Sequence, residues 1–118
     1  MSKISVVVLT KNSQKHLNKC INSIIKQKYN DFEIIIVDAD SIDNTKMILY
    51  TYKKFSSIPF TIIDVHSNTS IGKARQIGVN NSEGDIIAFV DSDVELPHDN
   101  WLKSMLEPLS DPNIAGTQ

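Results

Sequence analysis

Two aspartates one residue apart, Asp91 and Asp93, directly follow the mostly apolar run 85–90. Such a short, β-favouring run is typical of a parallel strand covered on both faces. In extended chain, residues i and i+2 project from the same face, roughly 6–7 Å apart. Both carboxylates would then enter one crevice, where two like charges are stable together mainly if a cation joins them. Mg²⁺ takes one or two carboxylates together with substrate phosphates, so the pair predicts a divalent metal bound with a diphosphate.

Further polar residues follow other expected strands or begin an expected helix. Thr10 and Asn12 come after the run 4–9, and the segment 38–43 comes after the run 32–37. Lys73 and Arg75 would lie in the first turn of a helix, where cations oppose the helix dipole. An anionic ligand nearby would reverse the sign of that effect, since backbone N–H groups and basic side chains would face the same phosphates.

The elements that must position these residues alternate along the chain. Strands are expected at 4–9, 32–37, 60–65 and 85–90, and another is expected to begin at 114–118, after Pro112. Ser13 and Asp43 are expected to cap the first two helices. A third helix should open at Ile71 or Gly72 and close near Gly84, and a fourth should start at Pro97–Asp99. The first helix shows the apolar spacing i, i+3, i+4, i+7, i+8 at Leu17, Cys20, Ile21, Ile24 and Ile25.

Strands separated by helices imply right-handed βαβ units, hence a mainly parallel sheet with helices on both faces. The fold class expected is α/β, a three-layer αβα arrangement. If the strand order is 3-2-1-4, the winding reverses between the first and fourth strands. Ligands in such sheets bind at the carboxyl ends of the strands at that switch point. The loops there would be 10–12 and 91–93.

Composition narrows the class of protein. At 118 residues the chain has room for one domain, 1–118. Twelve basic and fourteen acidic residues leave a net charge near zero, which gives no electrostatic case for a nucleic-acid partner. One cysteine, Cys20, cannot form an internal disulfide, so the chain reads as cytoplasmic. No apolar run approaches the ~18–20 residues of a membrane span; membrane association through segments outside this chain stays open.

Four ordered segments resemble family 2 glycosyltransferases of the GT-A, Rossmann-like fold, whose donors are nucleotide-diphospho-sugars. They lie at expected strand ends: residues 5–12, 36–45, 71–75, and 84–85 leading into 91–93. The resemblance covers nearly all of the chain and corresponds to the amino-terminal, donor-binding half. It implies a metal-dependent, inverting sugar transfer to an acceptor (a glycan, lipid or protein).

The resemblance also implies roles for residues. Asp93 would be the principal Mn²⁺ or Mg²⁺ ligand, and Asp91 would bind the ribose or hold the metal through water. A divalent cation suits this chemistry because it neutralises the charge that develops on the leaving diphosphate. The other residues expected to bind the donor are Thr10, Asn12, Asp38, Asp40, Lys73, Arg75 and Ser92.

The chain departs from the family pattern where the donor base is read. Ala39 replaces the second acid of an Asp-Asp pair, and Lys11 stands where an aromatic ring commonly stacks on the base. Gln76 replaces the asparagine that usually follows the donor-binding arginine. UDP-, GDP-, dTDP- and ADP-linked donors therefore all remain open.

No carboxylate in the chain matches the family's general base, which belongs to the acceptor half and is expected beyond Gln118. The chain is therefore expected to be a partial transferase. Two other classes compete: a non-catalytic nucleotide-sugar-binding module or remnant domain, and a metal-dependent phosphotransfer protein. The second is disfavoured because the first strand ends in Thr10, not in an acid. Cys20 fits the apolar stripe of the first helix, and His16, His66 and His98 show no metal-ligand spacing.

Overall fold

The computed structural model describes residues 2–109, in which strands and helices alternate strictly. In chain order the elements are β1 (Ile4–Thr10), α1 (Gln14–Ile25), β2 (Phe32–Ala39), α2 (Thr45–Phe55), β3 (Phe60–Val65), α3 (Ile71–Asn80), β4 (Ile86–Phe89) and α4 (Trp101–Leu109). The expected strand at 114–118 lies outside the described residues. No helix within 2–109 is long and apolar enough to cross a membrane.

The strands form one parallel sheet in the order β3-β2-β1-β4, which meets the condition on which the expected switch point depended. The register places Thr10 of β1 beside Asp38 of β2, and Asp38 beside Asp64 of β3. The polar residues at these strand ends therefore meet along one edge of the sheet. The winding reverses between β1 and β4, where the switch point was predicted.

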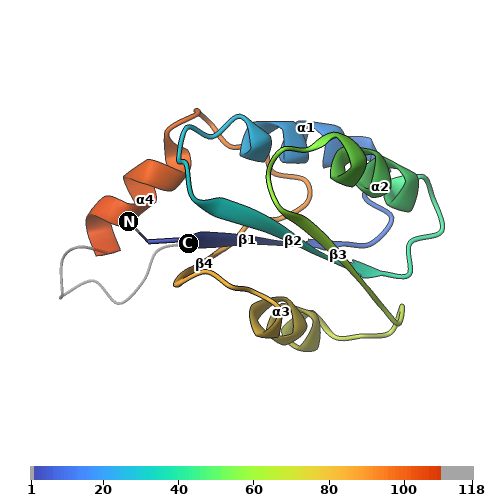
Figure 1. The fold of residues 1–118 in the computed structure, drawn as a ribbon. Coiled ribbons are helices and arrows are strands. Elements are labelled where there is room, and N and C mark those ends of the chain that lie inside the picture. Colours follow the sequence, from blue (N-terminus) through green and yellow to red (C-terminus); the bar gives the residue numbers. More distant parts are fainter. Residues whose placement is uncertain (1, 110–118) are drawn as a thin grey trace.

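Helices cover both faces of the sheet (Figure 1). On one face, α1 and α2 pack on the alternate side chains of β1 and β2 that point toward them, and α4 joins the same core through Leu102 and Met105. On the other face α3 lies alone, with Ala74 and Gly78 buried. Gly78 sits so close to β1 that an added Cβ would lie 2.6 Å from a methyl group of Val7. The expected three-layer αβα class is confirmed.

The start of two helices differs from the expectation. Ser13 occupies the N-cap position of α1, but its side chain makes no capping hydrogen bond to that helix. Asn44, not Asp43, occupies the N-cap position of α2. Asp43 instead accepts hydrogen bonds from Thr45 N (2.9 Å) and from Gln14 N at the start of α1 (3.3 Å). One carboxylate thus satisfies a free N–H at the start of each of two helices.

The end of the third helix and the start of the fourth also differ from the expectation. The third helix ends at Asn80 and does not extend to Gly84. Gly84 is required by a close crossing: an added Cβ would lie 2.7 Å from Ser5 N and 2.8 Å from Lys3 O. The fourth helix begins at Trp101, after an irregular stretch that contains Pro97 and Asp99. Both predictions were wrong because tertiary contacts, rather than the local residues alone, decide where the chain leaves or enters a helix.

Candidate functional site

A cleft of about 720 Å³ lies at the carboxyl ends of β1 and β4, on the switch point of the sheet. Its walls come from the β1–α1 loop, the first turns of α1 and α3, and the segment after β4. Of the residues predicted to bind donor or metal, the structure brings together in this cleft Thr10, Asn12, Arg75, Asp91, Ser92 and Asp93. Asp38, Asp40 and Lys73 do not line it.

Asp91 and Asp93 are both exposed and both line the cleft. They do not, however, project from extended chain, as their spacing suggested. Strand β4 ends at Phe89, and the residues after it form a turn in which Val94 N donates a hydrogen bond to Asp91 O at 3.0 Å. The two side chains therefore project from a turn, not from extended chain. Their shared position in the cleft is a property of this loop.

The donor set fits a divalent ion that a ligand helps to hold. Within residues 2–109, no three His, Cys, Asp or Glu side chains gather in a metal-binding group. A protein-only cage is therefore absent from that part of the chain. Two carboxylates facing an open cleft are what Mg²⁺ or Mn²⁺ needs when substrate phosphates complete the coordination. Asp91 and Asp93 are the residues that would hold it.

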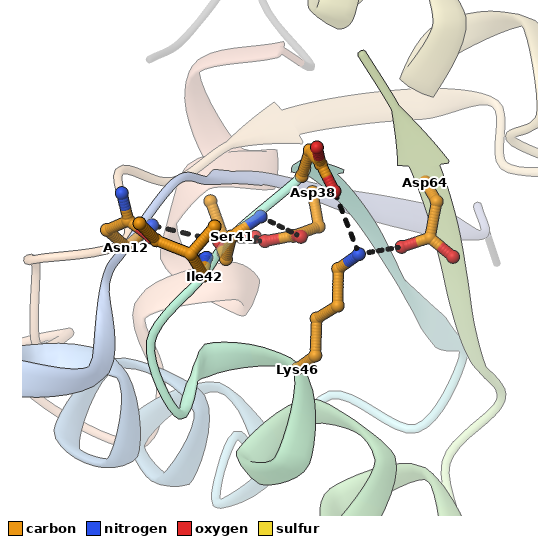
Figure 2. A network of polar contacts seen from close by, with 8 residues as sticks. Asn12, Asp38, Ser41, Ile42, Lys46 and Asp64 are labelled. Carbon is orange, nitrogen blue, oxygen red and sulfur yellow. Dashed lines mark hydrogen bonds and ion pairs between the residues drawn. The ribbon is translucent and has the colours of Figure 1, made fainter. Parts of the chain in front are cut away.

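Asp38 lies beneath the cleft and is completely buried. Its carboxylate accepts hydrogen bonds from Thr10 Oγ1 (2.6 Å), Ser41 Oγ (2.6 Å) and Ser41 N (3.0 Å), as Figure 2 shows in part. Three donors compensate for taking the charge out of water. In this structure Asp38 shapes the floor of the cleft through Thr10, and direct contact with a donor base stays a prediction.

Ser41, which the sequence did not single out, also ties the β1–α1 loop to the β2–α2 loop (Figure 2). Its Oγ accepts from Asn12 N at 2.8 Å, while Asn12 Oδ1 accepts from Ile42 N at 2.8 Å. Asn12 has a left-handed backbone with φ of 49°, a conformation that asparagine tolerates better than most residues. The side chain of Asn12 is thus committed largely to this link.

Asp40 turns away from the cleft toward Lys46. Lys46 Nζ lies 3.4 Å from Asp40 Oδ1 and 3.7 Å from Asp64 Oδ1, and Figure 2 shows Lys46 reaching the end of β3. Desolvation lowers the pKa of Lys46, but Asp64 and Asp40 outweigh it and raise the pKa above its usual value. Asp40, like Asn12, has a left-handed backbone, with φ of 52°. Lys73 is exposed on α3.

Lys11 and Arg75 are two of the cationic side chains that line the cleft, together with Lys15. The guanidinium of Arg75 lies 5.5 Å from the centre of the Phe89 ring, a cation–π arrangement that holds it at the end of β4. Lys11 Nζ donates a hydrogen bond to Ser67 O at 2.9 Å and so joins the β1–α1 loop to the segment after β3. Both charges favour an anionic occupant.

Cys20 contacts the turn that carries Asp91 and Asp93. It is completely buried in α1, as its place in the apolar stripe predicted, and its Sγ donates to Asp91 O at 3.5 Å. Burial, together with the charges of Asp93 and Asp91, raises the pKa of the Cys20 thiol to about 12. The group therefore remains a protonated thiol near neutral pH. The apolar spacing alone could not indicate this contact, because Asp91 is 71 residues away.

A family model named glycosyl transferase family 2 matches residues 5–118. The chain belongs to this family. Among curated relatives, poly(ribitol-phosphate) beta-N-acetylglucosaminyltransferase TarS of Staphylococcus aureus is 35% identical over 95 residues, which are 79% of this chain and 16% of TarS. Glycosyltransferase GlyA of Streptococcus pneumoniae is 38% identical over 77% of this chain and 13% of its own length. This family 2 chain thus spans only a small part of these relatives.

Solved structures agree with the family and the GT-A fold. The structure of S. aureus TarS 1-349 in complex with UDP-GlcNAc has a TM-score of 0.82 and 31% identity, and covers 92% of this chain and 31% of that one. The mannosyltransferase PcManGT from Pyrobaculum calidifontis, in complex with GDP-Man and Mn²⁺, has a TM-score of 0.88 over 94% of this chain and 33% of that one. At 21% identity the second likeness concerns the fold alone.

Proposed function

We propose that this family 2 chain is the donor-binding half of an inverting glycosyltransferase that uses a nucleotide-diphospho-sugar and a divalent metal. The observation that carries the proposal is the cleft at the switch point, which unites Asp91 and Asp93 with Arg75, Thr10 and Asn12. The acceptor (a glycan, lipid or protein) and the general base belong to parts of the protein beyond this chain.

The residues of the cleft have different roles in binding the donor. Asp91 and Asp93 hold the metal, which supplies positive charge to the diphosphate as the glycosidic bond breaks. Arg75 adds a second positive charge, held in place by the Phe89 ring. Thr10, at the end of β1, and Asn12, in the loop after it, line the side of the cleft where the nucleoside would bind. Thr10 is fixed by its bond to the buried Asp38, so this part of the pocket exists before the donor binds.

TarS, which was solved with UDP-GlcNAc, supports a nucleotide-sugar donor for this chain. PcManGT, which was solved with GDP-Man and Mn²⁺, supports the fold alone. Lys11 lines the cleft at the position where the family commonly has an aromatic ring. That replacement removes the ring that would stack on the base, so UDP-, GDP-, dTDP- and ADP-linked donors all remain candidates.

A thermal-shift screen of UDP-, GDP-, dTDP- and ADP-sugars, each with and without Mn²⁺, tests the proposal. A ligand at about 100 times its dissociation constant stabilises the native state by ~2.7 kcal/mol. One donor should raise the melting temperature in the presence of Mn²⁺. The variant Asp93→Asn should lose the part of the shift that depends on the metal.

Asp31→Asn is the matched control, since Asp31 is an exposed acid that directly precedes β2, at the opposite edge of the sheet. It removes the same charge and should leave the shift intact. A full metal-dependent shift in Asp93→Asn, or no shift with any donor, would contradict the proposed function.

A further inference from the structure

The α1 helix and the turn after it carry a stripe of polar side chains that hydrogen-bond to the segment 91–102. The stripe consists of Ser13, Cys20, Ser23 and Gln27, whose spacing of seven, three and four residues places them on one side of a helix. The segment itself runs from the aspartate turn to the start of α4 without regular structure of its own before Trp101. Figure 1 shows it passing beside α1.

Each member of the stripe makes a specific contact. Ser13 Oγ lies 3.1 Å from Ser92 Oγ, and Cys20 Sγ donates to Asp91 O. Ser23 Oγ accepts from Leu96 N at 2.9 Å. Gln27, which is 7% exposed, donates through Nε2 to His98 O (2.8 Å) and accepts through Oε1 from Leu102 N (2.9 Å). Cys20, Ser23 and Gln27 thus supply partners for backbone groups of the segment, whereas Ser13 contacts a side chain.

Ser13 is the member next to the carboxylates, and it is itself held firmly. Its backbone N–H donates to Thr45 Oγ1 at 2.7 Å, and Thr45 is completely buried at the start of α2. Thr45 N in turn donates to Asp43 Oδ1. The side chain of Ser13 therefore extends from a fixed point, where α1 and α2 meet, to the middle of the Asp91–Asp93 turn.

We propose that Ser13 is a positioning residue for the metal-binding carboxylates. Ser92 stands between Asp91 and Asp93 in a turn closed by the bond from Val94 N to Asp91 O. Holding the hydroxyl of Ser92 against α1 fixes the rotation of that turn, and with it the direction in which both carboxylates enter the cleft. The inference deepens the proposed function and rests on it. Ser13 itself lines the cleft, but this role requires no contact between Ser13 and the donor.

The test is direct Mn²⁺ binding, followed by electron paramagnetic resonance of free Mn²⁺, with Mn²⁺ alone and with Mn²⁺ plus UDP. Residues that orient metal ligands typically change metal affinity by 10–100-fold. Ser13→Ala should weaken Mn²⁺ binding about tenfold, at the lower end because the carboxylates themselves remain. Ser13→Thr, which keeps the hydroxyl, should retain most of the affinity.

Ser82→Ala is the matched control, because Ser82 donates to Gly78 O (2.7 Å) after the last turn of α3 and does not line the cleft. It should leave Mn²⁺ affinity unchanged. Ser92→Ala removes the other partner and should also weaken binding. Ser13→Ala additionally removes the hydrogen bond that Ser13 Oγ accepts from Lys11 N (3.1 Å), but the double variant should bind little more weakly than Ser13→Ala, since both changes break the same Ser13–Ser92 contact.

The possible outcomes distinguish a failure of this inference from a failure of the proposed function. If the parent chain binds Mn²⁺ and Ser13→Ala binds it equally well, the role of Ser13 is wrong while the metal site stands. Additive losses in the double variant would also overturn the inference. If the parent chain binds no Mn²⁺ in either condition, the metal dependence proposed above fails, and this inference fails with it.

Discussion

At the scale of single residues, Asp38 shows how a residue predicted to bind a ligand also holds the fold together. Its buried carboxylate accepts three hydrogen bonds, from Thr10 and Ser41, at the point where two loops must meet below the cleft. Sequence spacing placed Asp38 at a strand end but could not tell that its lone pairs are occupied from within the protein.

Asp38→Ala should therefore lower the free energy of unfolding by about 2–4 kcal/mol, because it leaves buried polar groups of Thr10 and Ser41 without their partner. Urea denaturation measures this loss. Asp40→Asn is the control: Asp40 is exposed, and asparagine tolerates the same left-handed backbone, so its loss should be much smaller. Equal losses in the two variants would contradict the structural role of Asp38.

Cys20 gives a second prediction at this scale. Only the thiolate reacts with iodoacetamide, and burial beside Asp93 and Asp91 raises the pKa of the thiol to about 12 from 9.0. Labelling of the native chain at pH 8 should be very slow, and labelling in urea should be fast. Because the pKa is raised in the folded state, the contribution of Cys20 to stability is complete below pH 9 and is lost as pH rises toward 12. Rapid native labelling at pH 8 would disprove the assignment.

At the scale of elements, α3 reaches the sheet through a glycine. Val7 and Val37 lie 2.6 and 3.4 Å from the Cβ that Gly78 lacks, so the helix packs closely over β1 and β2. That approach sets how near α3, which carries Arg75, lies to the sheet.

Gly78→Ala should destabilise the chain by about 1–3 kcal/mol, since the added methyl group overfills the contact with Val7. Gly72→Ala, in the same helix, is the matched control because an added Cβ there meets no atom within 4 Å. It should leave stability unchanged or raise it slightly. Thermal denaturation of the two variants distinguishes packing from helix propensity: a similar effect of both would argue against the close contact.

At the scale of the whole molecule, the sheet provides a rigid base and the loops at its carboxyl edge form the cleft. β1 and β2 are paired on both sides and buried on both faces, whereas β3, within residues 2–109, is bonded on one side only. Hydrogen–deuterium exchange should therefore be slowest in β1 and β2 and faster in β3 and in the segment 91–100. Faster exchange in β1 than in β3 would contradict this order.

The sequence by itself determined the alternation of strands and helices and the edge where the site lies, whereas the strand order entered only as a condition. These follow from local patterns: apolar runs, helical spacing of apolar residues, and the handedness of βαβ units. The polar residues 10–12 and 91–93 could be placed at one edge because parallel strands align their carboxyl ends.

Only the tertiary structure decided which of those polar residues face the cleft. Asp40 forms an ion pair with Lys46, and the buried Asp38 accepts a hydrogen bond from Thr10. The side chain of Ser13 makes no capping bond to α1 but contacts Ser92, 79 residues away. Gly84 is needed for a crossing against β1 rather than for a helix end. Such contacts join segments that are distant in the chain. The neighbouring residues in the sequence therefore do not indicate which group a hydroxyl or carboxylate will contact. The partner is fixed only when the strands are paired and the loops are brought within hydrogen-bonding distance.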